Sequence, residues 1–140
     1  MSDNLLCEKL PETVGHDAGY FAQRHCNIDC RGTLIIDKGS YWGFFVTVIT
    51  QSHPTGAWAQ GFAGEAIDRP VIVERGAWIG SNSVLYNCRI GQGAIVAIGS
   101  VVRSQEVAPY VMVAGNPARV IGRFASGKWN LLEEKWEVLA

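Results

Sequence analysis

Apolar residues recur at every sixth position over most of this chain. The first run places them at Ile36, Trp42 and Val48, and a small or β-branched residue follows four places after each. The pattern resumes beyond residue 66 with Ile67, Val73, Ile79, Leu85, Ile90, Val96 and Val102. A period of six fits neither a 3.6-residue helix nor simple strand alternation, whereas short strands joined by tight corners stack every sixth side chain in one interior. The pattern therefore predicts an all-β solenoid over residues 27–124.

Small residues follow the interior positions, and one step in the pattern is short. Gly43, Gly80 and Gly91 each come directly after an apolar residue of the repeat. A larger side chain there would crowd the next strand, and glycine can also take backbone angles that other residues resist. We therefore expect these glycines at corners. The step from Leu85 to Ile90 has five residues instead of six, and the pattern itself offers no reason for it.

Three segments depart from the repeat. Residues 1–26 are irregular and are expected to form an N-terminal cap or arm, and residues 54–66, rich in Gly and Ala, are expected to project from a corner as a loop. Asn130 with Glu133 resembles a helix start, and apolar residues recur after it at helical spacing. We expect a short helix over 128–139 that covers the open end of the solenoid. All 140 residues then form a single domain.

Composition and charge exclude several classes of protein. The chain has 12 basic and 13 acidic residues and a formal charge of −1, without the basic excess that attracts nucleic acid or an anionic membrane surface. No apolar stretch approaches the ~20 residues that cross a bilayer, and the N-terminus has no cationic start followed by a long apolar region. We therefore expect a soluble, cytoplasmic protein with no nucleic-acid partner and no membrane insertion.

The four cysteines are Cys7, Cys26, Cys30 and Cys88. Their spacing does not match a paired C-x2-C zinc site, so no metal is expected. We interpret them as reduced, structural thiols. A local metal or redox pair of Cys26 and Cys30 is the alternative.

The segment from Ile36 to Pro54 ends in the run V-T-V-I-T-Q-S-H-P, and its histidine is His53. This segment resembles the catalytic coil of hexapeptide-repeat acetyltransferases, which include galactoside, maltose and nodulation-factor O-acetyltransferases and enzymes that acetylate exopolysaccharides. The resemblance implies a left-handed parallel β-helix and makes His53 the base that takes a proton from the acceptor. Imidazole can accept that proton near neutral pH while a hydroxyl attacks a thioester carbonyl. Taken alone, His53 would be interpreted as a polar corner residue.

Two downstream strings resemble the coenzyme A side of the same family. Residues 77–83 read A-W-I-G-S-N-S, and the resemblance places Ser81 at the acetyl thioester and Trp78 along the cleft wall. A backbone N–H at this point could stabilise a developing oxyanion. Residues 113–121 read V-A-G-N-P-A-R-V-I, the most specific string of the family. The other residues implied to bind acetyl-CoA are Ala97, Ile98 and Gly99 along the pantetheine and Arg103, Ser104 and Arg119 at the phosphates. For each arginine, a solvated surface charge is the alternative.

The acceptor side departs from the family. Residues 21–26 read F-A-Q-R-H-C and resemble an F-A-N-x-x-C string of the galactoside enzymes, in which the asparagine contacts acceptor and thioester; Gln23 replaces it here. Arg31 stands where those enzymes carry an acidic acceptor-binding residue. Simple galactosides and maltose are therefore poor candidates. Trp58, in the loop, could line a substrate cleft or pack against a neighbouring subunit.

The resemblance implies transfer of an acetyl group from acetyl-CoA to a hydroxyl of a sugar or glycan intermediate, in a homotrimer with active sites between subunits. Transfer to an amine of an amino sugar or an antibiotic uses the same base and stays open. A metal site like that of γ-carbonic anhydrases needs three histidines, and His16, His25 and His53 lack the expected close spacing. A non-catalytic solenoid would need neither His53 nor the coenzyme A strings.

Overall fold

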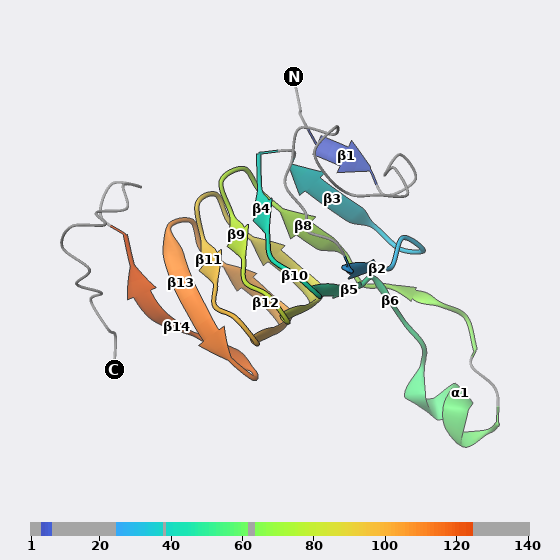
Figure 1. Cartoon of the computed structure of the whole chain (residues 1–140). Helices are drawn as coiled ribbons and strands as arrows, with labels where there is room; N and C mark the ends of the chain where they lie inside the picture. Colours follow the sequence, from blue (N-terminus) through green and yellow to red (C-terminus); the bar gives the residue numbers. More distant parts are fainter. Residues whose placement is uncertain (1–3, 7–24, 38, 62–63, 125–140) are drawn as a thin grey trace.

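The chain folds into a solenoid of short, mostly parallel strands (Figure 1). The computed structural model describes residues 4–6, 25–37, 39–61 and 64–124. In this part of the chain the elements are β1 (Asn4–Leu6), β2 (Asn27–Ile28), β3 (Leu34–Asp37), β4 (Tyr41–Trp42), β5 (Thr47–Ile49), β6 (Gln51–Ser52), α1 (Thr55–Ala59), β7 (Ile67–Asp68), β8 (Val71–Val73), β9 (Trp78–Ile79), β10 (Val84–Ile90), β11 (Ile95–Val96), β12 (Val101–Val107), β13 (Val111–Gly115) and β14 (Ala118–Arg123). Most strands have only two to four residues, as the sides between closely spaced corners require.

Strands from successive coils form three walls. The first wall is β2, β5 and the starts of β10 and β12; the second is β3, β8 and the ends of β10 and β12; the third is β4, β9, β11 and β13. All these pairs are parallel. Antiparallel strands lie at the two ends, where β1 pairs with β3 and β14 pairs with β13. The end strands thereby cover edges that would otherwise expose unpaired backbone groups.

The interior consists of the residues that the six-residue period selects, and the expected solenoid pattern is confirmed. In the third wall, Trp42, Ile79 and Val96 lie in register from coil to coil, and all three are buried. The other walls stack the buried sets Val48, Leu85 and Val102, and Ile36, Val73, Ile90 and Val107. Ile67 is the exception, because it lies in β7 outside this interior and is only partly buried.

The five-residue step lies within β10, which turns from the first wall to the second. Asn87 turns that corner with φ +48°, in the left-handed region. The next coil repeats the arrangement over residues 102–107, where Ser104 has φ +49°. Asn87 Nδ2 donates a hydrogen bond to Ser104 Oγ at 3.2 Å. Asparagine tolerates the left-handed conformation better than most residues. Asn82 and Gly76 are left-handed at corners with six-residue steps, so the backbone angle does not explain the shorter step.

The corner glycines lie where expected, but the reason is space and not backbone angle. None of Gly43, Gly80 and Gly91 has a positive φ, so the expectation of unusual backbone angles is wrong for them. A Cβ on Gly80 would lie 2.6 Å from the backbone nitrogen of Ile98 in the next coil, and one on Gly91 would lie 2.6 Å from that of Pro109. Coil stacking leaves no room for a side chain at these points.

The projecting segment departs in part from the expected loop. Residues 54–61 and 64–66 do leave the solenoid (Figure 1), but the segment begins with the short helix α1, in which Trp58 N donates to Pro54 O at 3.4 Å. The antiparallel pair of β6 and β7 closes the base of the segment. At the N-terminus, residues 4–6 form a strand, so they are not irregular. The rest of the expected N-terminal cap up to residue 24 and the expected helix over 128–139 lie outside the described residues.

The cysteines differ from the expectation that all are reduced. Cys30 is disulfide-bonded, whereas Cys26 and Cys88 are free, so the alternative of a Cys26–Cys30 pair is wrong as well. Disulfides depend on which side chains approach in space, and spacing along the chain cannot show that. Burial raises the pKa of the Cys88 thiol to about 12 and also raises the pKa of Cys26. Both thiols therefore stay protonated at neutral pH.

Replacing Gly80 with alanine should destabilise the solenoid, because the new methyl group meets backbone atoms of the next coil. The free energy of unfolding, measured by denaturant titration, should fall by ~1–3 kcal/mol, the usual cost of overpacking. Gly56→Ala is the matched control, since nothing lies within 4 Å of that position; it should unfold no more easily than the wild type. Equal stability of the two variants would contradict the crowded corner.

Candidate functional site

His53 lies at the base of the projecting segment, where the chain has just left the solenoid. β5 ends at Ile49, Thr50 turns outward, and β6 leads directly to His53. The imidazole is partly buried. Its Nδ1 atom is buried and has no hydrogen-bond partner among the described residues. Nε2 is therefore the ring nitrogen that can meet a ligand.

Trp58 on α1 contacts the imidazole of His53. The ring centroids lie 6.4 Å apart and the ring planes are perpendicular, at 90°. An edge-to-face contact of this kind is favourable and restricts the rotation of the imidazole. Trp58 is nevertheless 62% exposed, so its other face is open to a ligand or a partner. The structure thus brings together His53 and Trp58, which the sequence proposed separately as base and substrate-binding residue.

Residues of the preceding coil bind both ends of the projecting segment that carries His53. We call Thr50 to Ser52 its outgoing limb and Ile67 to Arg69 its returning limb. On the outgoing limb, Thr50 N donates to Asp29 Oδ2 at 3.1 Å, and Thr50 Oγ1 donates to Asp29 O at 3.0 Å. On the returning limb, the N–H and hydroxyl of Thr33 donate to the two carboxylate oxygens of Asp68 at 2.8 and 2.6 Å. Arg69 N donates to Thr50 O at 2.8 Å and links the limbs. We call Asp29, Thr33, Thr50 and Asp68 the loop clamp.

Arg31 neutralises one carboxylate of the loop clamp. Its Nε donates to Asp29 Oδ1 at 2.8 Å, and its Nη2 donates to Asp29 Oδ2 at 3.3 Å. These hydrogen bonds, with help from the N–H of Thr50, hold the pKa of Asp29 well below its usual range. Hydrogen bonds from Thr33 lower the pKa of Asp68 in the same way. Both groups are therefore carboxylates at neutral pH, and Arg31 has a partner within its own corner.

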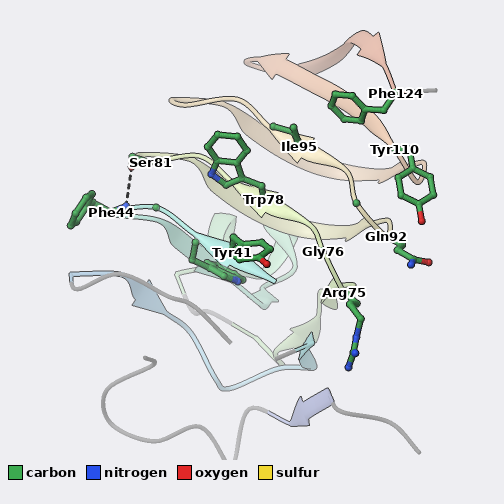
Figure 2. Close-up of a pocket in the computed structure, with 13 residues that line it drawn as sticks. Tyr41, Phe44, Arg75, Gly76, Trp78, Ser81, Gln92, Ile95, Tyr110 and Phe124 are labelled. Carbon is green, nitrogen blue, oxygen red and sulfur yellow. Dashed lines mark hydrogen bonds between the residues drawn. The ribbon is translucent and has the colours of Figure 1, made fainter. Parts of the chain in front are cut away.

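A second feature is a groove of about 710 Å³ on the outer face of the third wall (Figure 2). Tyr41, Trp78 and Ile95 lie in register on successive strands and form its floor. Tyr41 and Trp78 are 58% and 52% exposed. Arg75 and Gln92 lie near one end of this aromatic groove, as Figure 2 shows. A concave, mostly apolar surface with a few polar groups is typical of ligand sites.

Ser81 lies at the other end of the aromatic groove. Its Oγ accepts a hydrogen bond from the backbone N–H of Phe44 at 2.9 Å (Figure 2), and its carbonyl oxygen accepts one from Gly99 N at 2.9 Å. Ile98, beside Gly99, is 78% exposed. Trp78 and Ser81 therefore share the groove, and Ser81, Ile98 and Gly99 stack at the corner between the third and first walls, which we call the first corner.

The residues expected at the phosphates are more dispersed. Arg103 lies in β12 opposite Tyr86, and Ser104 lies at the corner between the first and second walls, the second corner. Arg119 lies in β14, where its Nη1 donates to the carbonyl oxygen of Ala118 at 3.1 Å. Ala97 continues the third wall, with its N–H donating to Val113 O at 2.9 Å. Among the described residues no hydrogen bond joins Arg103, Ser104 and Arg119.

The sequence did not single out the aromatic groove, although it contains a usable signal. Each residue that forms the floor of the groove comes one place before an interior residue of the repeat in the sequence, as Tyr41 comes before Trp42. In a two-residue strand that position faces outward, so an aromatic residue there is exposed. Gln23, expected at the acceptor, lies outside the described residues.

The described residues also bear on two other classes of site. Within ranges 4–6, 25–37, 39–61 and 64–124, no three His, Cys, Asp or Glu side chains converge as metal ligands would. In the same ranges, no helix has the length and apolar character needed to cross a membrane.

Comparison with known proteins shows what this chain is similar to. No family model matches the chain. A stretch of 53 residues, 37% of this chain, is 51% identical to the 2,3,4,5-tetrahydropyridine-2,6-dicarboxylate N-acetyltransferases of Staphylococcus aureus strains JH9 and JH1. That match covers 22% of those enzymes, so the chain spans only about a fifth of the length of the curated relatives it matches.

Solved structures give a broader match. A hexapeptide-repeat acetyltransferase from Vibrio cholerae is 29% identical with a TM-score of 0.57, over 66% of this chain and 57% of that one. Its structure with acetyl coenzyme A gives 25% identity and a TM-score of 0.59, over 77% and 72%. A galactoside acetyltransferase in complex with coenzyme A shares the fold, with a TM-score of 0.59 at 21% identity over 76% and 63%. The resemblance to hexapeptide-repeat acetyltransferases is thereby confirmed in sequence and in fold.

Acid should weaken the loop clamp through Asp29. Because the folded-state pKa of Asp29 lies below its unfolded value of ~4, the carboxylate stabilises the fold above that value and loses this effect as pH falls through the folded-state pKa. Melting temperatures should therefore fall below about pH 4, and Asp29→Asn should flatten that decline. Glu65→Gln, a change at an exposed loop carboxyl, is the control and should keep the wild-type slope. Identical slopes for Asp29→Asn and wild type would contradict this role of Asp29.

Proposed function

We propose that this chain is an acetyl-CoA-dependent acetyltransferase on a left-handed hexapeptide-repeat solenoid, acting on a hydroxyl of a sugar or glycan with His53 as the base. The observation that carries the proposal is the partly buried imidazole of His53, whose Nδ1 is buried without a hydrogen-bond partner among the described residues. We therefore assign the proton transfer to Nε2. Similarity to the Vibrio cholerae enzyme, which binds acetyl coenzyme A, supports the donor. The galactoside enzyme shares the fold at 21% identity, and the acceptor proposed here is a sugar or glycan other than a simple galactoside.

The proposed chemistry uses few groups. His53 Nε2 accepts the proton of the acceptor hydroxyl as the hydroxyl oxygen attacks the thioester carbonyl. The backbone at Ser81 stabilises the oxyanion of the tetrahedral intermediate. When the carbon–sulfur bond breaks, the protonated imidazole returns the proton to the departing thiolate, so His53 ends unchanged. The aromatic wall at Trp78 keeps water from the thioester.

Transfer to an amine is the second candidate, and one observation favours it. The 53-residue stretch at 51% identity is shared with N-acetyltransferases. The same imidazole would take the proton from an attacking amine. A screen of sugars and amino sugars, with detection of the free thiol released from acetyl-CoA, separates the two candidates, because only one class of acceptor should support release.

The positions of His53 and Ser81 favour a site shared between subunits, and the homotrimer implied by the family resemblance would supply it. Ser81 lies at the first corner and His53 follows the second corner, so the first wall separates them within one chain. The three residues Thr47–Ile49 alone span ~10 Å at strand spacing, too far for direct proton transfer. A second copy that brings its His53 to the Ser81 corner completes the site, and repetition of that contact around an axis closes a ring.

Light scattering should therefore return a mass of about 46 kDa, three times the 15.3 kDa of this chain, at micromolar concentration. A mixture of two inactive variants, His53→Ala and a second one changed at the first corner, should recover activity when subunits exchange, because one of the shared sites is then intact. A monomeric mass would rule out sites shared between subunits.

Removal of the proposed base should abolish turnover without unfolding the protein. His53→Ala should lower kcat by ~10²–10⁴-fold, the usual contribution of a positioned general base, and His53→Asn, which has similar shape but no basic nitrogen, should be nearly as inactive. Thiol release is measured beside a thermal melt. A folded variant that keeps more than about a third of wild-type turnover would exclude His53 as the base.

Arg119 should act on acetyl-CoA binding and not on the chemical step. Its guanidinium is exposed and already oriented by the carbonyl of Ala118. Arg119→Ala should raise the KM for acetyl-CoA by ~10-fold with little change in kcat, because a phosphate contact is equal in ground and transition states. Arg89→Ala is the control, since Arg89 pairs with Glu74 at 2.7 Å on the second wall. An effect confined to kcat would count against the phosphate contact.

A further inference from the structure

His53 is oriented by an unusual set of contacts. A histidine that acts as a base is commonly held by a hydrogen bond on its second ring nitrogen. Here Nδ1 is buried without such a partner among the described residues, and Trp58 contributes only a ring contact. The direction of the imidazole therefore depends on where the backbone of its segment lies.

We propose that Thr33 and Asp68 are positioning residues for His53, which act by holding the two limbs of the projecting segment in register. This proposal rests on the proposed function, in which His53 is the base. Neither residue belongs to the buried interior, and neither touches the groove. Their role is to fix the position of the projecting segment relative to the solenoid.

The outgoing limb is held at Thr50, which is fully buried. Its hydroxyl both donates to Asp29 O and accepts from Gly32 N at 2.9 Å, so the side chain cannot rotate without losing a bond. A Cβ on Gly32 would overlap the backbone oxygen of Thr50, which shows how closely the preceding coil lies against this limb. His53 is only three residues further on, so the limb has little freedom on that side.

The returning limb has a weaker backbone connection. β6 and β7 pair over two residues only, with Gln51 opposite Asp68 and Ser52 opposite Ile67. A ladder this short is marginal by itself. The two hydrogen bonds from Thr33 to the Asp68 carboxylate, at 2.8 and 2.6 Å, are charge-assisted and bidentate, and they anchor β7 to the first coil. Because β7 pairs with β6, that anchor also fixes the residues directly before His53.

The placement of this anchor argues for a role beyond stability. Thr33 and Asp68 are exposed, and exposed polar pairs contribute little to the free energy of unfolding. Displacement of a catalytic group by about 1 Å, in contrast, can lower the rate by ~10²-fold. A loosened β6–β7 base should therefore slow the chemical step long before it unfolds the solenoid.

The test compares Thr33→Val, which removes the hydroxyl at nearly constant shape, with Thr33→Ser, which keeps it. Thr33→Val and Asp68→Asn should lower kcat by ~10–10²-fold, with the KM for acetyl-CoA and the melting temperature near wild-type values. Thr33→Ser should retain most of the wild-type kcat. Thiol release from acetyl-CoA is measured with the best acceptor of the screen described above.

A second readout needs no acceptor. In protein labelled with ¹⁵N-histidine, the ring signals of His53, assigned by their loss in His53→Ala, should shift or broaden in Thr33→Val and Asp68→Asn but not in Thr33→Ser. Wild-type signals and wild-type kcat in Thr33→Val would overturn the proposal, as would a rise in KM alone. If His53→Ala itself stayed active, the proposed function would fail, whereas the ring signals would still decide whether Thr33 and Asp68 orient His53.

Discussion

Backbone hydrogen bonds between successive coils are the constraint on which the rest of this structure depends. Each short strand pairs in parallel with a strand one coil away, so the coils stack at a spacing of ~4.8 Å. At that spacing interior side chains one full coil apart lie directly over one another, as Ile79 does between Trp42 and Val96. Two-residue strands, which could not be stable alone, thereby share one continuous, mostly apolar interior.

The same spacing decides what can occupy the corners, for two separate reasons. Gly80 is small because the backbone of the next coil fills the space where its side chain would be. Asn87 and Ser104 are there because the second corner requires a left-handed backbone. The first reason is steric crowding between coils, and the second is the conformation of one coil. Both produce small or polar residues in the sequence, which is why the pattern by itself could not tell them apart.

The segment that carries His53 lies outside the stacked coils, so other contacts have to fix its geometry. The first corner is rigid because Ser81 and Gly99 are joined coil to coil, which suits a surface that must meet a ligand without rearranging. Beyond Thr50 the hydrogen bonds between coils stop. The chain is then held only by the pairing of β6 with β7 and by the hydrogen bonds of the loop clamp. The first corner thus continues the backbone ladder, whereas the segment with His53 is held by a few hydrogen bonds.

The sequence by itself determined the period, and through it most of the interior residues and the corners, because these are local properties repeated along the chain. It also supplied the resemblance that singled out His53. Only the tertiary structure decided that Trp58 lies against His53, that His53 and Ser81 flank opposite ends of one wall, that Cys30 is bonded, and that Thr33 meets Asp68. The Trp58–His53 contact depends on how the projecting segment folds, and the others depend on which residues far apart in the sequence come to lie side by side. The six-residue period gives only the length of each side of a coil.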